Sequence, residues 1–98
     1  MDILLEGRRR IALVVEYDGT NYSGYQWQPR SLTVQYEIET AINRFTGETI
    51  RVRGASRTDS GAHAKGQTVD FLTCSRHPAD KFVRALNFFL PRDIRIRS

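Results

Sequence analysis

The chain has 98 residues, of which 40% are hydrophobic, and a formal net charge of +4 at pH 7. This length supports one modest domain with a single core. Cys74 is the only cysteine, which excludes an intrachain disulfide and a cysteine zinc site and fits a reducing compartment. No apolar run approaches the roughly 18 residues of a membrane-spanning helix, and the N-terminus lacks the apolar core of a secretory signal.

The charge is unevenly distributed along the chain. Residues 1–50 contain five Arg and seven acids, whereas residues 51–98 contain ten Lys or Arg and four acids. A basic half of this kind predicts a surface that meets a polyanion, although a solvated arginine-rich surface explains the same counts.

The first predicted strand is RIALVVEY, residues 10–17, whose β-branched and apolar residues suit a central strand. Residues 1–9 are expected to be an N-terminal extension. Residues 18–31 then form a loop, and loops of this length without structure of their own are usually functional. A helix is predicted over residues 34–46, with Thr33 as its N-cap and Gly47 as its stop. Its apolar residues share one helical stripe: Val34, Ile38, Ala41, Ile42 and Phe45.

The second half predicts two more strands, a helix and the beginning of a fourth strand. Residues 48–54 predict a strand with Ile50 and Val52 inward, and residues 66–74 predict one with Val69 and Phe71 on a shared face. Pro78 suits the first turn of a second helix that ends at Pro91, and residues 93–98 begin the last strand. The apolar residues of this helix are Phe82, Val83, Leu86, Phe89 and Leu90. The order predicts an α+β fold, a split βαβ ferredoxin-like domain whose antiparallel sheet has two helices on one face.

The segment GASRTDSGAHAKGQ, residues 54–67, holds more charge than a hairpin connection needs. Arg57 and Asp59 are one residue apart, so their side chains are expected to lie close together. A guanidinium keeps a neighbouring carboxylate ionised, and such a carboxylate can act as a nucleophile at a sugar carbon. Spacing alone still favours a simpler structure, a salt-bridged β-turn in which Asp59 caps backbone amides.

Three other types of site fit this segment less well. A metal site lacks a third ligand beside Asp59 and His63. A two-carboxylate glycosidase lacks a second acid in the loop. A serine triad lacks a spacing that would let His63 orient Ser56 or Ser60.

The loop after the first strand is expected to interleave exposed aromatic rings with amides and other polar groups: Tyr17, Asp18, Tyr22, Tyr25, Gln26, Trp27 and Gln28. Rings and amides together suit single-stranded RNA, whose bases stack and bond through their edges. An Ω-loop that folds its rings back onto the core is an equally good interpretation.

Four blocks resemble the tRNA pseudouridine synthase A family in order and spacing: YDGTNYSGYQWQ, TVQYEIETAI, ASRTDSGAHAKGQTVDF and ALNFFLPRDI. The resemblance runs from about Ile11 to Ile96. The Arg-Thr-Asp-x-Gly block is the most specific. Tyr25, where the family more often has Trp, and Ala62, where it more often has Val, are mild departures.

The resemblance implies that Asp59 is the catalytic aspartate and that Arg57 helps to hold a flipped-out nucleotide. The expected substrate is tRNA, at uridines 38 to 40 of the anticodon arm, with no cofactor, no metal and no membrane partner. The remaining residues expected on the substrate side, some of them shaping the loop or contacting phosphates, are Tyr25, Gln26, Trp27, Gln28, His63, Lys65 and Gln67.

Members of this family are roughly twice this long or more, with two related halves that form the active site between them. Residues 10–98 are then expected to be the N-terminal half of the catalytic region, inactive alone, with the C-terminal half absent. The resemblance also implies a homodimer in the cytoplasm, or in the nucleus or an organelle of a eukaryote. The alternative is a non-enzymatic RNA-binding module, which needs aromatic residues on its central strands; only Phe71 is available, and it pairs with Val69 toward the core.

Overall fold

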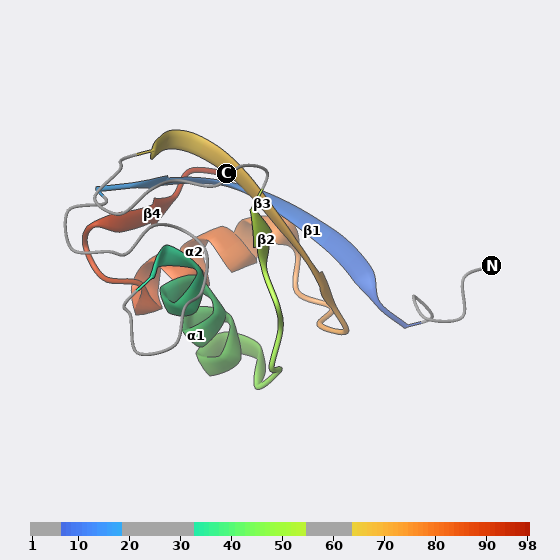
Figure 1. Cartoon of the computed structure of the whole chain (residues 1–98). Helices are drawn as coiled ribbons and strands as arrows, with labels where there is room; N and C mark the ends of the chain where they lie inside the picture. Colours follow the sequence, from blue (N-terminus) through green and yellow to red (C-terminus); the bar gives the residue numbers. More distant parts are fainter. Residues whose placement is uncertain (1–6, 19–32, 55–63) are drawn as a thin grey trace.

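Both helices lie on the same face of one antiparallel sheet in the computed structural model of this chain (Figure 1). The structure describes residues 7–18, 33–54 and 64–98, apart from the side chains of residues 64 and 65. The strand order is β2-β3-β1-β4, and every pair is antiparallel. The elements are β1 (Arg9–Tyr17), α1 (Val34–Thr46), β2 (Arg53–Gly54), β3 (Ala64–Thr73), α2 (Ala79–Phe89) and β4 (Ile94–Ile96). The predicted split βαβ arrangement is confirmed.

The core lies between the sheet and the helices because β1 and β3 alternate strictly. Leu13 and Val15 of β1 are buried on the helix side, as are Val69 and Phe71 of β3. Phe71 packs against Phe82 of α2, with ring centroids 5.7 Å apart. Successive side chains of a strand point to opposite faces, so burying one set leaves the other set on the open face of the sheet.

The predicted ends of α1 are confirmed in detail. The Thr33 side chain accepts a hydrogen bond from the Tyr36 amide at 3.2 Å, which satisfies one of the free N–H groups of the first turn. Gly47 follows the helix with a φ of 77°, in the left-handed region that glycine enters without strain. α2 begins after Pro78 and ends before Leu90, within a residue or two of its predicted limits.

β2 is much shorter than the predicted strand over residues 48–54. Only Arg53 and Gly54 pair with β3. The Val52 amide donates instead to the Glu39 carboxylate of α1, at 2.8 Å, so this part of the chain bonds to the helix. Ile50 and Val52 are nevertheless buried, as their inward assignment predicted.

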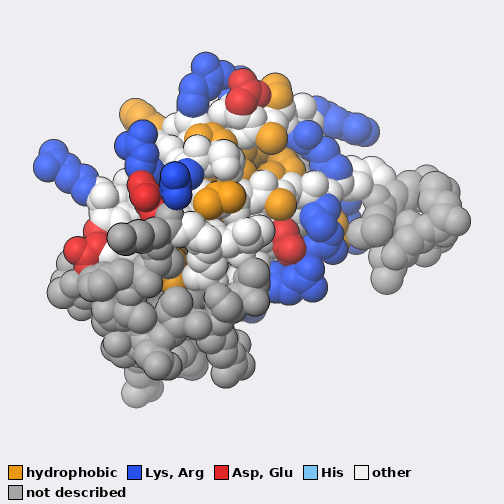
Figure 2. Space-filling model, turned by 90° about the horizontal axis from the view of Figure 1, so that it is seen from above, with side chains coloured by type: hydrophobic (Ala, Val, Ile, Leu, Met, Phe, Trp, Pro, Cys, Tyr) orange, Lys and Arg blue, Asp and Glu red, His pale blue; other side chains and the backbone are white. Residues whose placement is uncertain are grey.

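The open face of the sheet, away from the helices, is basic. Figure 2 shows lysine and arginine side chains around a band of hydrophobic ones. The alternation of β1 and β3 assigns to this face Arg10, Ala12, Val14, Asp70 and Leu72. Within the described ranges, no helix is long and apolar enough to cross a membrane.

Candidate active-site end of the sheet

Most of the predicted site residues fall in two segments that lie outside the described residues. Residues 55–63 contain Arg57, Asp59 and His63. Residues 19–32 contain Tyr25, Gln26, Trp27 and Gln28. Lys65 belongs to β3, but its side chain is also outside the description. Gln67 is the predicted site residue whose side chain is described.

The strand ends that flank these two segments meet at one end of the sheet. Tyr17, the last residue of β1, lies opposite Ala64, the first residue of β3, and also opposite Ile94 of β4. The Asp18 amide donates to the Asp93 carbonyl at 2.9 Å. One segment therefore leaves from the end of β1, and the other returns to the start of β3 directly beside it.

A buried hydrogen bond joins the two strands at this end. The Tyr17 hydroxyl donates to Oε1 of Gln67 at 2.7 Å, and the two residues are 5% and 6% exposed. Both lie on the helix side of the sheet. A buried phenol and a buried amide each need a polar partner, so this pair satisfies both and fixes the end of β1 to the start of β3.

The strand register shifts where this bond forms. Val15 lies opposite Gln67, but Tyr17 lies opposite Ala64, so β3 has one more residue than β1 over this stretch. Such a bulge redirects the strand and is often found beside active sites. The bond between Tyr17 and Gln67 spans this irregularity.

The family resemblance placed Gln67 at the site, whereas Tyr17 was expected among the exposed aromatic residues of the following loop. Tyr17 is instead the last residue of β1 and is buried. Tyr17 falls on the inward face of the first predicted strand, where a tyrosine hydroxyl must find a buried partner. This need for a polar partner was the feature of the sequence that could have indicated a buried hydrogen bond at Tyr17. It could not name Gln67, because the partner depends on the strand register.

Carboxyl groups gather near the same end. Partial burial raises the pKa of Glu37, in the first turn of α1, and the negative charge of Asp93 raises it further, whereas Arg44 acts to lower it. In the described parts of the chain, no three His, Cys, Asp or Glu side chains are grouped as metal ligands would be.

Together, the fold and this end of the sheet define an α+β domain with a split βαβ scaffold, in which the end of β1 and the start of β3 lie side by side. Residues 13–98 match the family model described as tRNA pseudouridine synthase, and that range includes both segments. The chain belongs to the tRNA pseudouridine synthase family.

Individual relatives agree with this assignment. The tRNA pseudouridine synthase A of Caldicellulosiruptor saccharolyticus is 53% identical over 90 residues, that of Brevibacillus brevis 52%, and that of Acetivibrio thermocellus 53%. Each alignment covers 92% of this chain and 37% of the relative. The chain therefore spans little more than a third of the length of these relatives.

Proposed function

We propose that the protein containing this chain converts uridine to pseudouridine in the anticodon arm of tRNA, at positions 38 to 40, with Asp59 as the catalytic carboxylate. The main support is the match over residues 13–98 to a family and to relatives that carry the name tRNA pseudouridine synthase. The Arg57 and Asp59 pair lies inside the matched range.

The reaction needs no chemical group beyond a carboxylate, which Asp59 of residues 54–67 supplies. The bond between C1′ and N1 of uridine breaks, the base is retained, and C1′ bonds to C5, while a proton leaves C5 and another is gained at N1. Nothing is oxidised or reduced and no water is consumed. A single carboxylate that attacks the sugar or assists proton removal is therefore sufficient.

Substrate binding must offset the cost of extruding the target base. Taking a nucleotide out of its stack costs a few kcal/mol. Arg57 is proposed to hold the extruded nucleotide, and Tyr25, Gln26, Trp27 and Gln28 to contact neighbouring bases. His63 and Lys65 are proposed to shape the loop or contact phosphates. Gln67, through its bond to Tyr17, is proposed to position the start of β3 from beneath the sheet.

The decisive test is Asp59→Asn in the complete protein. Pseudouridine formation on unmodified tRNA should be abolished, while tRNA affinity stays within a few fold, because the amide keeps the shape and loses the charge. Asp80→Asn is the matched control, since Asp80 is an exposed carboxylate on α2, 77% accessible. Turnover by Asp59→Asn would contradict the assignment. Mapping the product along the tRNA tests the proposed positions.

Tyr17→Phe tests the structural support of the site. The substitution removes the buried hydrogen bond from the phenol to Oε1 of Gln67, and such a bond contributes about 0.5–1.5 kcal/mol. We expect a lower free energy of unfolding in urea and slower pseudouridine formation. An unchanged rate would remove this bond from the mechanism.

The rest of the proposal concerns the whole protein. Residues 1–98 alone should give no pseudouridine, and the complete protein should sediment as a homodimer and act on tRNA in the cytoplasm. The alternative, a non-enzymatic RNA-binding module, would be indicated if the complete protein bound tRNA and made no product. Phe71, the aromatic residue that such a module would need on its surface, is buried against the helices.

A further inference from the structure

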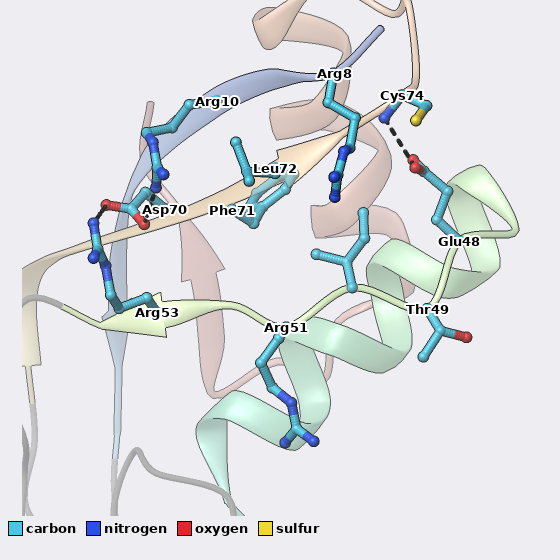
Figure 3. A pocket seen from close by; sticks show the side chains of 11 residues that line it. Arg8, Arg10, Glu48, Thr49, Arg51, Arg53, Asp70, Phe71, Leu72 and Cys74 are labelled. Carbon is cyan, nitrogen blue, oxygen red and sulfur yellow. Dashed lines mark hydrogen bonds and ion pairs between the residues drawn. The ribbon is translucent and has the colours of Figure 1, made fainter. Parts of the chain in front are cut away.

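A hollow of about 510 Å³ lies along β3, where β2 does not pair with it (Figure 3). A carboxylate side chain lies at each of its two ends. Glu48 accepts hydrogen bonds from the Thr73 hydroxyl and, at 2.9 Å, from the Cys74 amide. Asp70 lies at the other end. The hollow exists because the chain around Ile50 bonds to α1 and leaves this side of β3 open.

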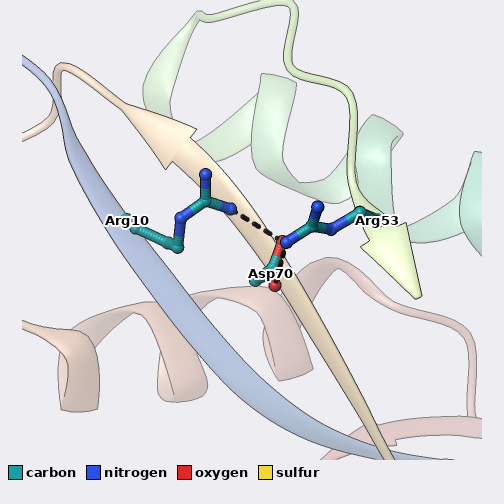
Figure 4. A network of polar contacts seen from close by, with 3 residues as sticks. All are labelled: Arg10, Arg53 and Asp70. Atoms are coloured by element: carbon teal, nitrogen blue, oxygen red, sulfur yellow. Dashed lines mark hydrogen bonds and ion pairs between the residues drawn. The ribbon is translucent and has the colours of Figure 1, made fainter. Parts of the chain in front are cut away.

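Two arginines share the carboxylate of Asp70 (Figure 4). Arg10, from β1, contacts Oδ1 at 3.0 Å, and Arg53, from β2, contacts Oδ2 at 3.2 Å. The arginine side chains are 50% and 73% exposed, whereas that of Asp70 is 23% exposed. A guanidinium has five N–H donors, so each arginine is held by one contact and keeps most of its donors accessible.

The lining of the hollow is positively charged overall. Four arginines, Arg8, Arg10, Arg51 and Arg53, line it with two carboxylates, an excess of two positive charges. Arg8 reaches down into the hollow from the start of β1, as Figure 3 shows. Arginine forks match phosphate geometry, and holding them in place on Asp70 reduces the entropy lost when a ligand binds.

We infer that Arg10 and Arg53, held by Asp70, bind the phosphodiester backbone of RNA at a site displaced along β1 from the buried Tyr17 and Gln67 pair. Asp70 lies opposite Ala12, five residues before Tyr17, which is about 17 Å along the strand. This contact serves nucleotides that flank the target. It carries no sequence information, because only phosphates are contacted. The choice of RNA as the ligand rests on the proposed function, whereas the arrangement of the arginines comes from the structure alone.

The test compares Arg10→Gln, Arg53→Gln and the double variant in the complete protein, with Asp59→Asn as background so that no turnover occurs. Binding of a fluorescent tRNA is measured by anisotropy from 50 mM to 400 mM salt. Each phosphate contact contributes about 0.7–0.9 to the slope of log affinity against log salt. Each variant should lose about that slope and about four- to fivefold in affinity near 0.15 M salt. The double variant should lose about 20-fold, and an RNA of scrambled sequence should be affected equally.

Arg84→Gln is the matched control, because it removes the same charge from an exposed side chain on α2, on the other side of the sheet. It should change affinity by less than about twofold, since a distant exposed charge is screened. Equal losses in Arg84→Gln and in each single variant would overturn the inference, because net charge alone would then explain binding. An unchanged salt slope in the double variant would also overturn it.

Two further outcomes separate this inference from its alternatives. A double variant that loses affinity for poly-glutamate but not for tRNA would overturn the RNA assignment and indicate an acidic protein partner. Failure of the proposed function has a different signature: the protein with Asp59 intact would make no pseudouridine, while the salt slopes for RNA binding would still separate the double variant from Arg84→Gln.

Discussion

The two faces of the sheet use the same strands in opposite ways. On the helix face, β1 contributes Leu13 and Val15, both nearly inaccessible, to a closed apolar core. On the open face, its alternate residue Arg10 meets Arg53 and Asp70 in a polar network with exposed arginines. The helix face holds the apolar core, whereas the open face carries the arginines to which we assign RNA binding. Substitutions should separate these two roles.

The largest expected effect comes from adjacent residues that point to opposite faces. Leu13 is 1% exposed, so Leu13→Ala should lower the free energy of unfolding by about 2–5 kcal/mol through lost contacts and a cavity. Val14→Ala, on the open face, should cost about 1 kcal/mol or less. Urea unfolding of both variants measures the contrast, and similar losses would contradict the distinction between the faces.

The outer edge of β4 gives the next effect. The Asn87 side chain donates to the Ile96 carbonyl at 2.9 Å and accepts from the Ile96 amide at 2.8 Å, so α2 caps this strand edge as a neighbouring strand would. Asn87→Ala removes both bonds and should cost about 1–2 kcal/mol. It should also expose an edge that can pair with another chain, which light scattering would detect.

Asn43→Ala is the control for that prediction. Asn43 makes one exposed side-chain bond, to the Glu48 carbonyl at 3.1 Å. Its loss should cost less than about 0.5 kcal/mol and cause no association. Association of both variants would show that Asn87 has no special role at the edge.

The contribution of Glu48 to stability depends on pH. Partial burial raises its pKa, but hydrogen bonds from Thr73, the Cys74 and Ser75 amides and Thr46 outweigh this effect and hold the pKa below its usual value of 4.5. A depressed pKa means that the ionised form stabilises the folded state. The contribution is complete above that usual value and is lost as the pH falls through the lower pKa of the folded state.

Glu48→Gln should therefore cost about 1 kcal/mol near neutral pH, a modest loss because Glu48 is only partly buried. The difference from the unsubstituted protein should shrink as acid protonates Glu48. Chemical unfolding at a series of pH values from 7 downward measures this. A difference that grows in acid would contradict the sign.

The smallest stability effect is expected on the open face. Arg10→Gln and Arg53→Gln break exposed ion pairs, which contribute about 0–1 kcal/mol, so each variant should unfold within about 0.5 kcal/mol of the unsubstituted protein. Thermal unfolding checks this. Retained stability beside weakened RNA binding would place their role in recognition, whereas a large loss of stability would place it in folding.

Much of the fold could be predicted because its signals are local. Thr33 and Gly47 limit α1 through the chemistry of helix ends, and the alternation of β1 reports which residues face the helices. The length of β2 could not be predicted in this way. Residues 48–52 have a strand pattern, but the Val52 amide bonds to Glu39, thirteen residues earlier in the chain.

For the candidate site too, some residues could be predicted from the sequence and others required the structure. The importance of Asp59 and Arg57 came from the resemblance of four sequence blocks, since spacing alone favoured a salt-bridged turn, and their roles remain a prediction. The Tyr17 bond to Gln67 and the arginine pair on Asp70 came from the structure, because each depends on strand register.

By itself, the sequence determined the element types, the helix limits, the buried stripes and the family resemblance, because these depend on side-chain chemistry and on spacings of a few residues. Only the tertiary structure decided that the edge of β4 is capped by Asn87, that β2 leaves a hollow along β3, and that three strands bring Arg10, Arg53 and Asp70 together. The contact between Arg10 and Asp70, for example, joins residues 60 positions apart. Their proximity follows from how the strands pair, which no local pattern specifies.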